Sequence, residues 1–224
     1  ILFNNRIYGL TKGQYSPTSE RGFVSKSSPY GTVEDPFIPA ELCFGARGRF
    51  FARSLDIDMK LLGSCMVAAA QHKGAAIVEV LVNCVIFNDG VHKGVADRAT
   101  REERSIVLRH GEKMIFGKDK NKGIVLDGLR LKAVTIGEDG YTLDDVLTHD
   151  AHEEDPTLHT MLAMMGTNDD MPVAMGVIRD VAGISYDEAV TQQIEEVKAQ
   201  KPGIRKLEDV LLKDAYWEVK AEDL

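Results

Sequence analysis

The pattern that most constrains the fold lies between residues 50 and 82. An apolar stretch at residues 50–53 is followed by a helical pattern, in which Leu61, Cys65 and Ala69 recur on one face, and then by a nearly continuous apolar run at residues 75–82. Such a run is typical of a parallel strand that is covered on both faces. The segment therefore predicts a strand, a helix and a second, parallel strand joined by a right-handed crossover.

The ends of this helix carry residues suited to helix termini. Asp56 or Asp58 is positioned to cap its N-terminus, Lys73 is expected to place a cation in its last turn, and Gly74 lies just past its end. Upstream, residues 1–4 are expected to end another buried strand, and residues 40–46 to form a short helix. Together these elements predict an α/β fold in which helices flank a mainly parallel sheet.

The later part of the chain has a different pattern. Residues 99–108 are expected to form a charged helix, and Asp127-Gly128 lies between two apolar stretches, which is typical of a hairpin. Ser185-Tyr186-Asp187-Glu188 matches a capping box and opens a predicted helix that runs to about Gln200. A further helix is predicted near residues 206–216.

Composition excludes several classes of protein. The 224 residues carry a formal net charge of −8, which argues against a nucleic-acid surface. The most apolar stretch, residues 65–87, is interrupted by Gln71-His72-Lys73 and so predicts a helix and a strand, not a membrane span. Three cysteines lie far apart and form no Cys-x-x-Cys pair, which suits a reducing compartment. We expect a soluble, cytoplasmic protein with neither nucleic acid nor membrane as a partner.

Polar residues follow three of the predicted parallel strands where each strand ends. Asn5, Ser54 and Asn83-Cys84 occupy these positions, and Asn5 opens a long Gly- and Pro-containing loop at residues 5–36. Ligands of open α/β sheets bind at the carboxyl edge of the strands, and long loops in compact domains are usually functional. We therefore predict that Cys84 and the Asn5 loop are neighbours in space.

The start of that loop suits a metal-bound phosphate. Magnesium on a diphosphate takes oxygen ligands, including side-chain amides and main-chain carbonyls, and a Gly-containing loop offers backbone donors to phosphate. An asparagine at a strand end also commonly satisfies backbone groups of its own loop. The residue types alone leave both roles of Asn5 open.

Residues 5–18, Asn-Arg-Ile-Tyr-Gly-Leu-Thr-Lys-Gly-Gln-Tyr-Ser-Pro-Thr, resemble the thiamine-diphosphate loop in the beta subunits of 2-oxoacid:ferredoxin oxidoreductases. The resemblance runs from residue 1 to about residue 117 and is looser beyond. It implies that residues 1–117 are the C-terminal part of a thiamine-diphosphate-binding domain. Residues 118–224 are then a C-terminal α+β extension with the hairpin and the helices.

The resemblance assigns cofactor contacts within the loop. It implies that the Asn5 carboxamide and the Ile7 main-chain carbonyl are Mg²⁺ ligands, and that Tyr8, Gly9 and Thr11 contact thiamine diphosphate. The family's carboxylate ligand for Mg²⁺ belongs to a Gly-Asp-Gly-Asp segment that is absent from this sequence and that we expect upstream of it.

The same loop is implied to meet the substrate. Leu10 and Lys12 face the substrate end of the cofactor in the resembled family, and Lys12 would attract a substrate carboxylate. Gln14, Ser16 and Thr18 are further candidates for contact with phosphate or substrate.

A second segment resembles the family's iron–sulfur site. Residues 82–88, Val-Asn-Cys-Val-Ile-Phe-Asn, resemble the segment whose cysteine is the fourth ligand of a [4Fe–4S] cluster, so Cys84 is implied to bind iron. The other three cluster cysteines of the family lie near its N-terminus and are expected upstream of this sequence. Cys43 and Cys65 lack suitable spacing, and we expect both in the hydrophobic core.

Two further groups of polar residues have structural interpretations. Glu79 stands alone in the apolar run, and we expect it to pair with a neighbouring Arg or Lys instead of serving as a proton donor. His149 and His152 lie among carboxylates and could bind zinc, but they lack the His-Glu-x-x-His order and are followed by Pro156. We favour a structural or surface role for them.

The resemblance implies an enzyme whose chemistry belongs largely to its cofactors. Thiamine diphosphate attacks the keto carbon of a 2-oxoacid, CO₂ leaves, two electrons pass through the cluster to ferredoxin, and the acyl group goes to coenzyme A. Leu-Thr-Lys-Gly at residues 10–13 resembles the 2-oxoglutarate or broad 2-oxoacid branch more than the pyruvate branch. An alpha, or fused gamma-alpha, subunit and ferredoxin are the implied protein partners.

Three alternatives remain open from the sequence. One is a non-redox thiamine-diphosphate enzyme of the decarboxylase or acetohydroxyacid synthase type, which would lack a cluster. Another is a zinc hydrolase built on His149 and His152. The third is a subunit-interaction module with no activity of its own.

Overall fold

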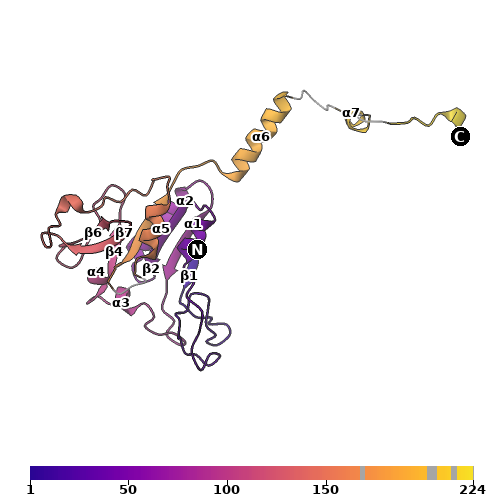
Figure 1. The fold of residues 1–224 in the computed structure, drawn as a ribbon. Helices are drawn as coiled ribbons and strands as arrows, with labels where there is room; N and C mark the ends of the chain where they lie inside the picture. The colour runs from indigo at the N-terminus through magenta and orange to yellow at the C-terminus, as the bar shows by residue number, and fades with distance from the viewer. Residues whose placement is uncertain (167–169, 201–205, 213–215, 224) are drawn as a thin grey trace. The chain divides into compact units, whose positions relative to one another are not determined.

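A computed structural model describes residues 1–166, 170–200, 206–212 and 216–223 (Figure 1). The described residues form two compact units, Ile1–Gly183 and Ile184–Leu224, and each is described by itself. The first unit contains both sheets and the candidate site.

A mixed sheet forms the centre of the first unit. Within the described residues it has five strands in the order β1-β3-β2-β8-β4, and these are β1 (Leu2–Asn4), β3 (Ala76–Leu81), β2 (Phe50–Leu55), β8 (Val173–Asp180) and β4 (Ser105–Leu108). The pairs β1/β3, β3/β2 and β8/β4 are parallel, and β2/β8 is antiparallel. The predicted α/β fold with a mainly parallel sheet is confirmed.

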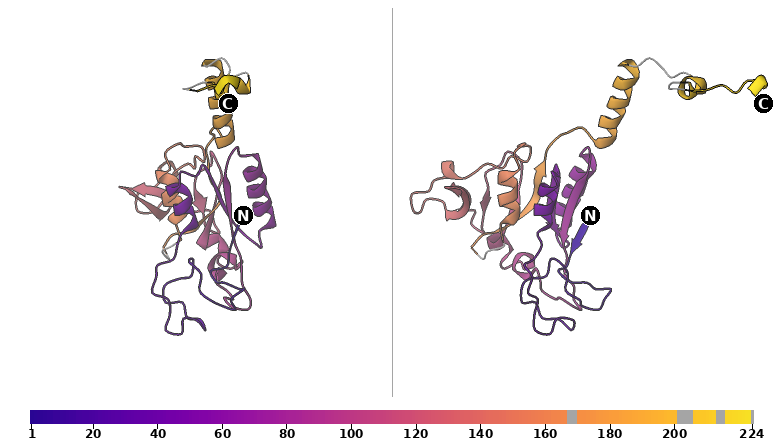
Figure 2. Two further views of the ribbon diagram at one scale, coloured as in Figure 1. Left: turned by 90° about the vertical axis from the view of Figure 1, so that its right-hand side faces the viewer. Right: turned by 45° about the vertical axis from the view of Figure 1, so that its right-hand side comes forward.

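Helices cover both faces of this sheet. Helix α2 (Met59–Gln71) packs on one face, where Phe50, Ala52 and Cys65 are buried in one cluster. Helices α1 (Pro39–Gly45) and α5 (Thr157–Met164) pack on the other face, in a cluster that includes Phe51. Successive residues of a strand point to opposite faces, so β2 is buried along its whole length. Figure 2 shows α2 and α5 on opposite sides of the strands.

The predicted strand–helix–strand unit is confirmed, including the cap of its helix. The Asp58 carboxylate accepts a hydrogen bond from the backbone N–H of Leu61 at 3.1 Å, which satisfies one of the free donors at the helix N-terminus. The helix ends at Gln71, and Gly74 adopts a φ of +115° before β3 begins. Gly74 therefore lies past the helix, as expected, whereas Lys73, which was predicted in the last turn, lies in the connection as well.

Two local predictions are wrong. The charged helix predicted at residues 99–108 is one turn, α4 (Arg101–Arg104), followed by strand β4, in which Ile106 and Leu108 are buried and Val107 is exposed. This alternation lets β4 pair with β8, and pairing outweighs the helical preference of the charged residues. Strand β1 exists as predicted but is not buried: Phe3 is 69% exposed, because β1 is the outermost strand among the described residues.

A second, antiparallel sheet follows. It contains β5 (Ile115–Phe116), β6 (Lys122–Asp127) and β7 (Arg130–Thr135), preceded by the short helix α3 (Lys93–Ala96) and followed by the 3₁₀ turn η1 (Leu143–Asp145). The predicted hairpin is confirmed. Its closing pair is Asp127 with Arg130, so the two loop residues are Gly128 and Leu129, one position later than the sequence indicated.

The predicted boundary near residue 117 stays a prediction. Strand β8, which comes from the later part of the chain, lies between β2 and β4 in the same sheet. The later part of the chain therefore contributes to the main sheet as well as to the hairpin.

The second unit contains α6 (Tyr186–Gln200), α7 (Leu207–Leu211) and η2 (Ala221–Asp223). The capping box at Ser185 is confirmed, since the backbone N–H of Glu188 donates to Ser185 Oγ and the backbone N–H of Ser185 donates to Glu188 Oε2, both at 3.3 Å. Helix α7 is shorter than predicted, and residues 213–215 of that prediction lie outside the described residues. Among the helices that the structure describes, none has the length and apolar character needed to cross a bilayer.

Candidate functional site

The three parallel strands β1, β3 and β2 end at the same edge of the sheet. Asn4 is paired with Leu81, and Leu81 with Leu55, so the last residues of the three strands lie side by side. The long loop at residues 5–36 starts at this edge, directly after β1. The strand ends that the sequence predicted at the carboxyl edge of the sheet therefore lie together at that edge.

The loop after β3 contacts the loop after β1. Asn88 Nδ2 donates to the carbonyl oxygens of Asn5 at 3.1 Å and Arg6 at 3.3 Å. The Asn88 backbone N–H in turn donates to the Cys84 carbonyl at 2.9 Å, and the Cys84 thiol is partly exposed and free. The predicted proximity of Cys84 to the Asn5 loop is confirmed.

Residues 8–14 form a closed turn. The Tyr8 N–H donates to the Gln14 carbonyl at 2.8 Å, the Gly13 N–H donates to the Tyr8 carbonyl at 3.0 Å, and the Lys12 N–H donates to the Gly9 carbonyl at 3.0 Å. Leu10 is 98% exposed at the tip of this turn, and Lys12 is also exposed. The tip therefore presents an apolar and a cationic side chain away from the body of the chain.

The Asn5 side chain is engaged locally. Its Oδ1 accepts a hydrogen bond from the Ile7 backbone N–H at 3.2 Å, which is the backbone role that the residue type left open. A carboxamide oxygen has two lone pairs, so this bond leaves one for a cation. Ile7 is buried with 3% of its surface exposed, which anchors the main chain that follows Asn5.

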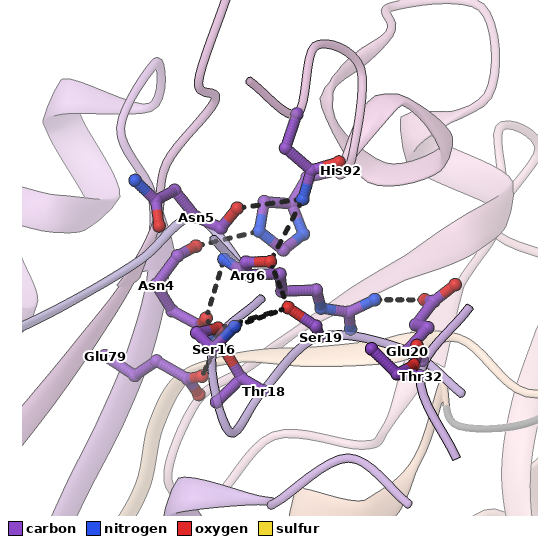
Figure 3. A network of polar contacts seen from close by, with 11 residues as sticks. Asn4, Asn5, Arg6, Ser16, Thr18, Ser19, Glu20, Thr32, Glu79 and His92 are labelled. Atoms are coloured by element: carbon purple, nitrogen blue, oxygen red, sulfur yellow. Dashed lines mark hydrogen bonds and ion pairs between the residues drawn. The ribbon is translucent and has the colours of Figure 1, made fainter. Parts of the chain in front are cut away.

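Sequence reasoning missed Asn4, the residue with the densest set of contacts at this edge (Figure 3). Asn4 Nδ2 donates to Glu79 Oε1 at 2.7 Å. Asn4 Oδ1 accepts from Thr18 Oγ1 at 2.8 Å and from the Arg6 backbone N–H at 3.3 Å, and the Asn4 carbonyl accepts from His92 Nε2 at 2.9 Å. A pair of asparagines at a strand end was the only sign of this role in the sequence.

Glu79 pairs with Arg53, as the sequence predicted. Arg53 Nε lies 2.7 Å from Glu79 Oε2, and the two side chains are 6% and 2% exposed. Burial raises the pKa of the Glu79 carboxyl, but the Arg53 charge and the hydrogen bonds from Arg53 and Asn4 outweigh burial and lower the pKa overall. Glu79 is therefore an ionised carboxylate inside the sheet and not a proton donor.

A cavity of about 230 Å³ lies over this pair. Burial lowers the pKa of His92, which faces it, so that this imidazole is neutral. The polar side chains that line the cavity are Asn4, Arg6, Thr18, Glu20, Arg53, Glu79 and His92.

The outer part of the long loop is held by its own hydroxyl groups. Ser19 Oγ donates to the Arg6 carbonyl at 2.6 Å and accepts from the Ser16 backbone N–H at 2.9 Å. Arg6 and Glu20 form an ion pair across the loop. These bonds (Figure 3) keep residues 16–20 folded back on the end of β1.

The histidines of the later segment have structural partners. His149 Nε2 donates to the Val177 carbonyl at 3.0 Å, and His159 Nε2 donates to the Asp150 carbonyl at 2.8 Å. His152 Nδ1 contacts the Asp180 carbonyl. In the described parts of the chain, no three His, Cys, Asp or Glu groups are placed to hold a metal ion. The hydrogen bonds of His149 and His152 agree with the structural or surface role predicted for them.

No family model matches the chain. The curated 2-oxoglutarate oxidoreductase subunit KorB of Mycobacterium tuberculosis is 39% identical over 220 residues, which are 98% of this chain and 58% of that protein. The beta subunit of 2-oxoacid:ferredoxin oxidoreductase 1 from Aeropyrum pernix is 40% identical over 89 residues, which are 40% of this chain and 28% of that protein. The chain is therefore similar, over nearly its whole length, to a subunit of a 2-oxoglutarate oxidoreductase.

A solved structure of a family enzyme has the same fold. It is 2-oxoglutarate:ferredoxin oxidoreductase from Magnetococcus marinus, with a TM-score of 0.63 and 20% identity, matched over 96% of this chain and 57% of that one. The resemblance inferred from the sequence is confirmed. The match to the KorB subunit extends through nearly the whole chain, whereas the resemblance became loose near residue 117. The chain spans 58% of the length of that relative.

Proposed function

We propose that the chain is part of the beta subunit of an enzyme that oxidises a 2-oxoacid, with 2-oxoglutarate favoured, to an acyl-CoA and passes the electrons to ferredoxin. The 39% identity to a 2-oxoglutarate oxidoreductase subunit over 98% of the chain supports this most strongly. The Leu-Thr-Lys-Gly sequence at residues 10–13 favours the same branch. The activity is assigned to the complete enzyme, because the chain spans 58% of that relative.

The Asn5 loop is proposed to hold thiamine diphosphate through Mg²⁺. The donor set fits the ion, because Asn5 Oδ1 and the Ile7 carbonyl are neutral oxygen ligands of the kind that magnesium accepts beside phosphate oxygens. Tyr8, Gly9 and Thr11 belong to the closed turn that follows and would border the cofactor. When bound, the cofactor supplies the carbon nucleophile and the electron sink of the reaction.

The tip of the turn is proposed to meet the substrate. Leu10 and Lys12 project from it and are exposed, so both are available to a ligand or a facing subunit. The Lys12 ammonium would attract a carboxylate of the 2-oxoacid, and Leu10 would exclude water beside it. Attraction between such groups increases when a facing subunit removes water from around them.

Cys84 is proposed to be a ligand of a [4Fe–4S] cluster. Its thiol is free and partly exposed, and its loop lies against the Asn5 loop, which would bring the cluster and the cofactor into the same region. Cys43 and Cys65 are buried at 4% and 0% exposure and serve the core, as predicted. The cluster needs four ligands, so the other three must come from outside the described residues.

The proposed partners are an alpha, or fused gamma-alpha, subunit, ferredoxin, coenzyme A and the 2-oxoacid. The Magnetococcus marinus structure holds 2-oxoglutarate, coenzyme A and succinyl-CoA, which supports the same ligands here. The unit Ile184–Leu224 is proposed to contact the alpha subunit, because α6 has no buried residue and exposes Ile194 and Val197. Removing residues 185–224 and finding the subunits still associated would contradict that contact.

One assay separates the proposal from its alternatives. The complete enzyme, purified without oxygen, is expected to reduce ferredoxin only when 2-oxoglutarate and coenzyme A are both present, and to contain iron and acid-labile sulfide. Cys84→Ser should lower the iron content and stop electron transfer. An enzyme that decarboxylates 2-oxoacids without iron would instead be a non-redox thiamine enzyme.

A further inference from the structure

A buried chain of hydrogen bonds connects the middle of the sheet to the proposed cofactor loop. It runs through three neighbouring strands, from Arg53 in β2 to Glu79 in β3 and on to Asn4 in β1. Arg53 in β2 is paired with Glu79 in β3, and Glu79 is paired with Leu2 in β1. Asn4 lies two residues after Leu2 on β1, so its side chain points to the same face as that of Leu2. The three side chains therefore share one face of the sheet.

The inner end of this chain is tied to the core. Arg53 Nη1 donates to the carbonyl oxygens of Ala163 at 3.2 Å and Ala174 at 3.3 Å, and Nη2 also donates to Ala163. These carbonyls belong to the last turn of α5 and to β8. Because the guanidinium is planar and held at several points, it fixes the position of the Glu79 carboxylate.

The outer end of the chain controls the direction of one amide. A carboxylate only accepts hydrogen bonds, so Glu79 requires the Asn4 NH₂ group to face inward. Asn4 Oδ1 must then face outward, where it accepts from Thr18 and from the Arg6 backbone N–H. Asn4 and Arg6 are the residues on either side of Asn5, so this amide holds the main chain on both sides of the proposed magnesium ligand.

We propose that Arg53 and Glu79 are positioning residues for the magnesium and thiamine-diphosphate site. Arg53 keeps Glu79 ionised and in place, Glu79 orients the Asn4 carboxamide, and Asn4 holds the main chain from which Asn5 and Ile7 present their oxygens. This inference rests on the proposed function of that loop. A buried ion pair contributes little net stability compared with apolar residues, so its effect lies in the orientation it imposes.

Glu79→Gln is the direct test, made in the complete enzyme. Glutamine has the same shape, but its NH₂ group can face Asn4 and let the Asn4 amide turn over. The dissociation constants of Mg²⁺ and thiamine diphosphate are measured by titration calorimetry, and the melting temperature is measured without cofactor. Partners of metal ligands typically contribute 10- to 100-fold to metal affinity, so we expect both constants to rise by about that factor.

A matched control and a milder variant keep the test decisive. Asp180→Asn removes the carboxylate of another partly buried polar contact, between His72 Nδ1 and Asp180 Oδ1 at 2.8 Å, which joins the C-terminal cap of α2 to the last residue of β8. It should leave both constants unchanged. Thr18→Val removes one of the donors to Asn4 Oδ1 at a partly exposed position, so it should raise both dissociation constants less than Glu79→Gln does. It provides the test if Glu79→Gln does not assemble.

The outcomes separate the inference from the function on which it rests. A wild-type enzyme that does not bind thiamine diphosphate contradicts the proposed function. A wild-type enzyme that binds it while Glu79→Gln or, failing that, Thr18→Val binds equally well overturns the inference alone. Weaker binding in Asp180→Asn as well, in step with a lower melting temperature, would assign the effect to general stability and also overturn it.

Discussion

Replacing Arg53 by methionine tests how the sheet tolerates an unpaired charge. In Arg53→Met, Glu79 keeps its hydrogen bond from Asn4 but loses the cation 2.7 Å from Oε2, with both side chains nearly inaccessible to water. Removing one partner of a buried ion pair costs about 3–5 kcal/mol. In a chain of this size each kcal/mol lowers the melting temperature by roughly 2–4 °C, so we expect a fall of about 6–20 °C.

The loss should depend on pH in a defined direction. Without Arg53, burial would raise the pKa of Glu79 above its ordinary value of 4.5. A group whose pKa is raised in the folded state contributes full stability below its unfolded pKa and loses it as pH rises through the folded pKa. The deficit of Arg53→Met against the wild type should therefore be large near neutrality and shrink toward acid pH.

Urea unfolding of the wild type, Arg53→Met and Arg53→Met/Glu79→Gln checks this reasoning at about pH 8 and about pH 5.5. The double variant removes both charges of this pair, so it should recover much of the stability at the higher pH. The reasoning is refuted by a deficit of equal size at both pH values, or by a double variant as unstable as the single one. Either result would mean that Arg53→Met loses stability because the packing of the Arg53 side chain is lost, and not because Glu79 is left unpaired.

Three shorter predictions concern other parts of the first unit. In the cluster-free chain, Cys84 should react with a thiol reagent before Cys65 does. Cys65 is fully buried, and burial raises the pKa of its thiol to about 11. Mass spectrometry before and after unfolding locates the label. Gly176→Ala should destabilise the chain by about 1–3 kcal/mol in urea unfolding. The φ of Gly176 is +90°, and the added Cβ would lie 2.6 Å from the Leu108 carbonyl oxygen. A variant as stable as the wild type would contradict the geometry of that strand. Burial lowers the pKa of His149 below its ordinary 6.5, so its contribution to the free energy of unfolding is present above pH 6.5 and is lost as pH falls. The melting temperature should therefore drop on acidification, and it should drop less in His149→Gln. An identical pH profile for that variant would exclude His149 as a source of the drop.

Local patterns in the sequence were enough for several elements. Caps and tight turns depend on residues close together in sequence. The start of α2 at Asp58, the start of α6 at Ser185 and the hairpin at Gly128 could therefore be predicted. The segment at residues 99–108 could not, because its charged composition favours a helix while its strand exists only by pairing with β8. The partner strand is distant in sequence and carries no mark of that pairing.

The candidate site divides in the same way. The meeting of the Asn5 and Cys84 loops followed from a general property of parallel sheets, whose strand ends share one edge. The pairing of Glu79 followed from the cost of burying a lone charge. Neither argument identified Asn4, because an asparagine at a strand end has many possible partners.

By itself the sequence determined that this chain forms a mainly parallel sheet with a polar loop at its carboxyl edge, since periodicity, caps and turn residues act over short distances. Tertiary structure decided which polar groups meet. Asn4 reaches Glu79 across 75 positions of sequence, and it does so only because the strand order places β3 between β1 and β2. Buried polar groups must find partners, and the order of strands determines which partners are within reach.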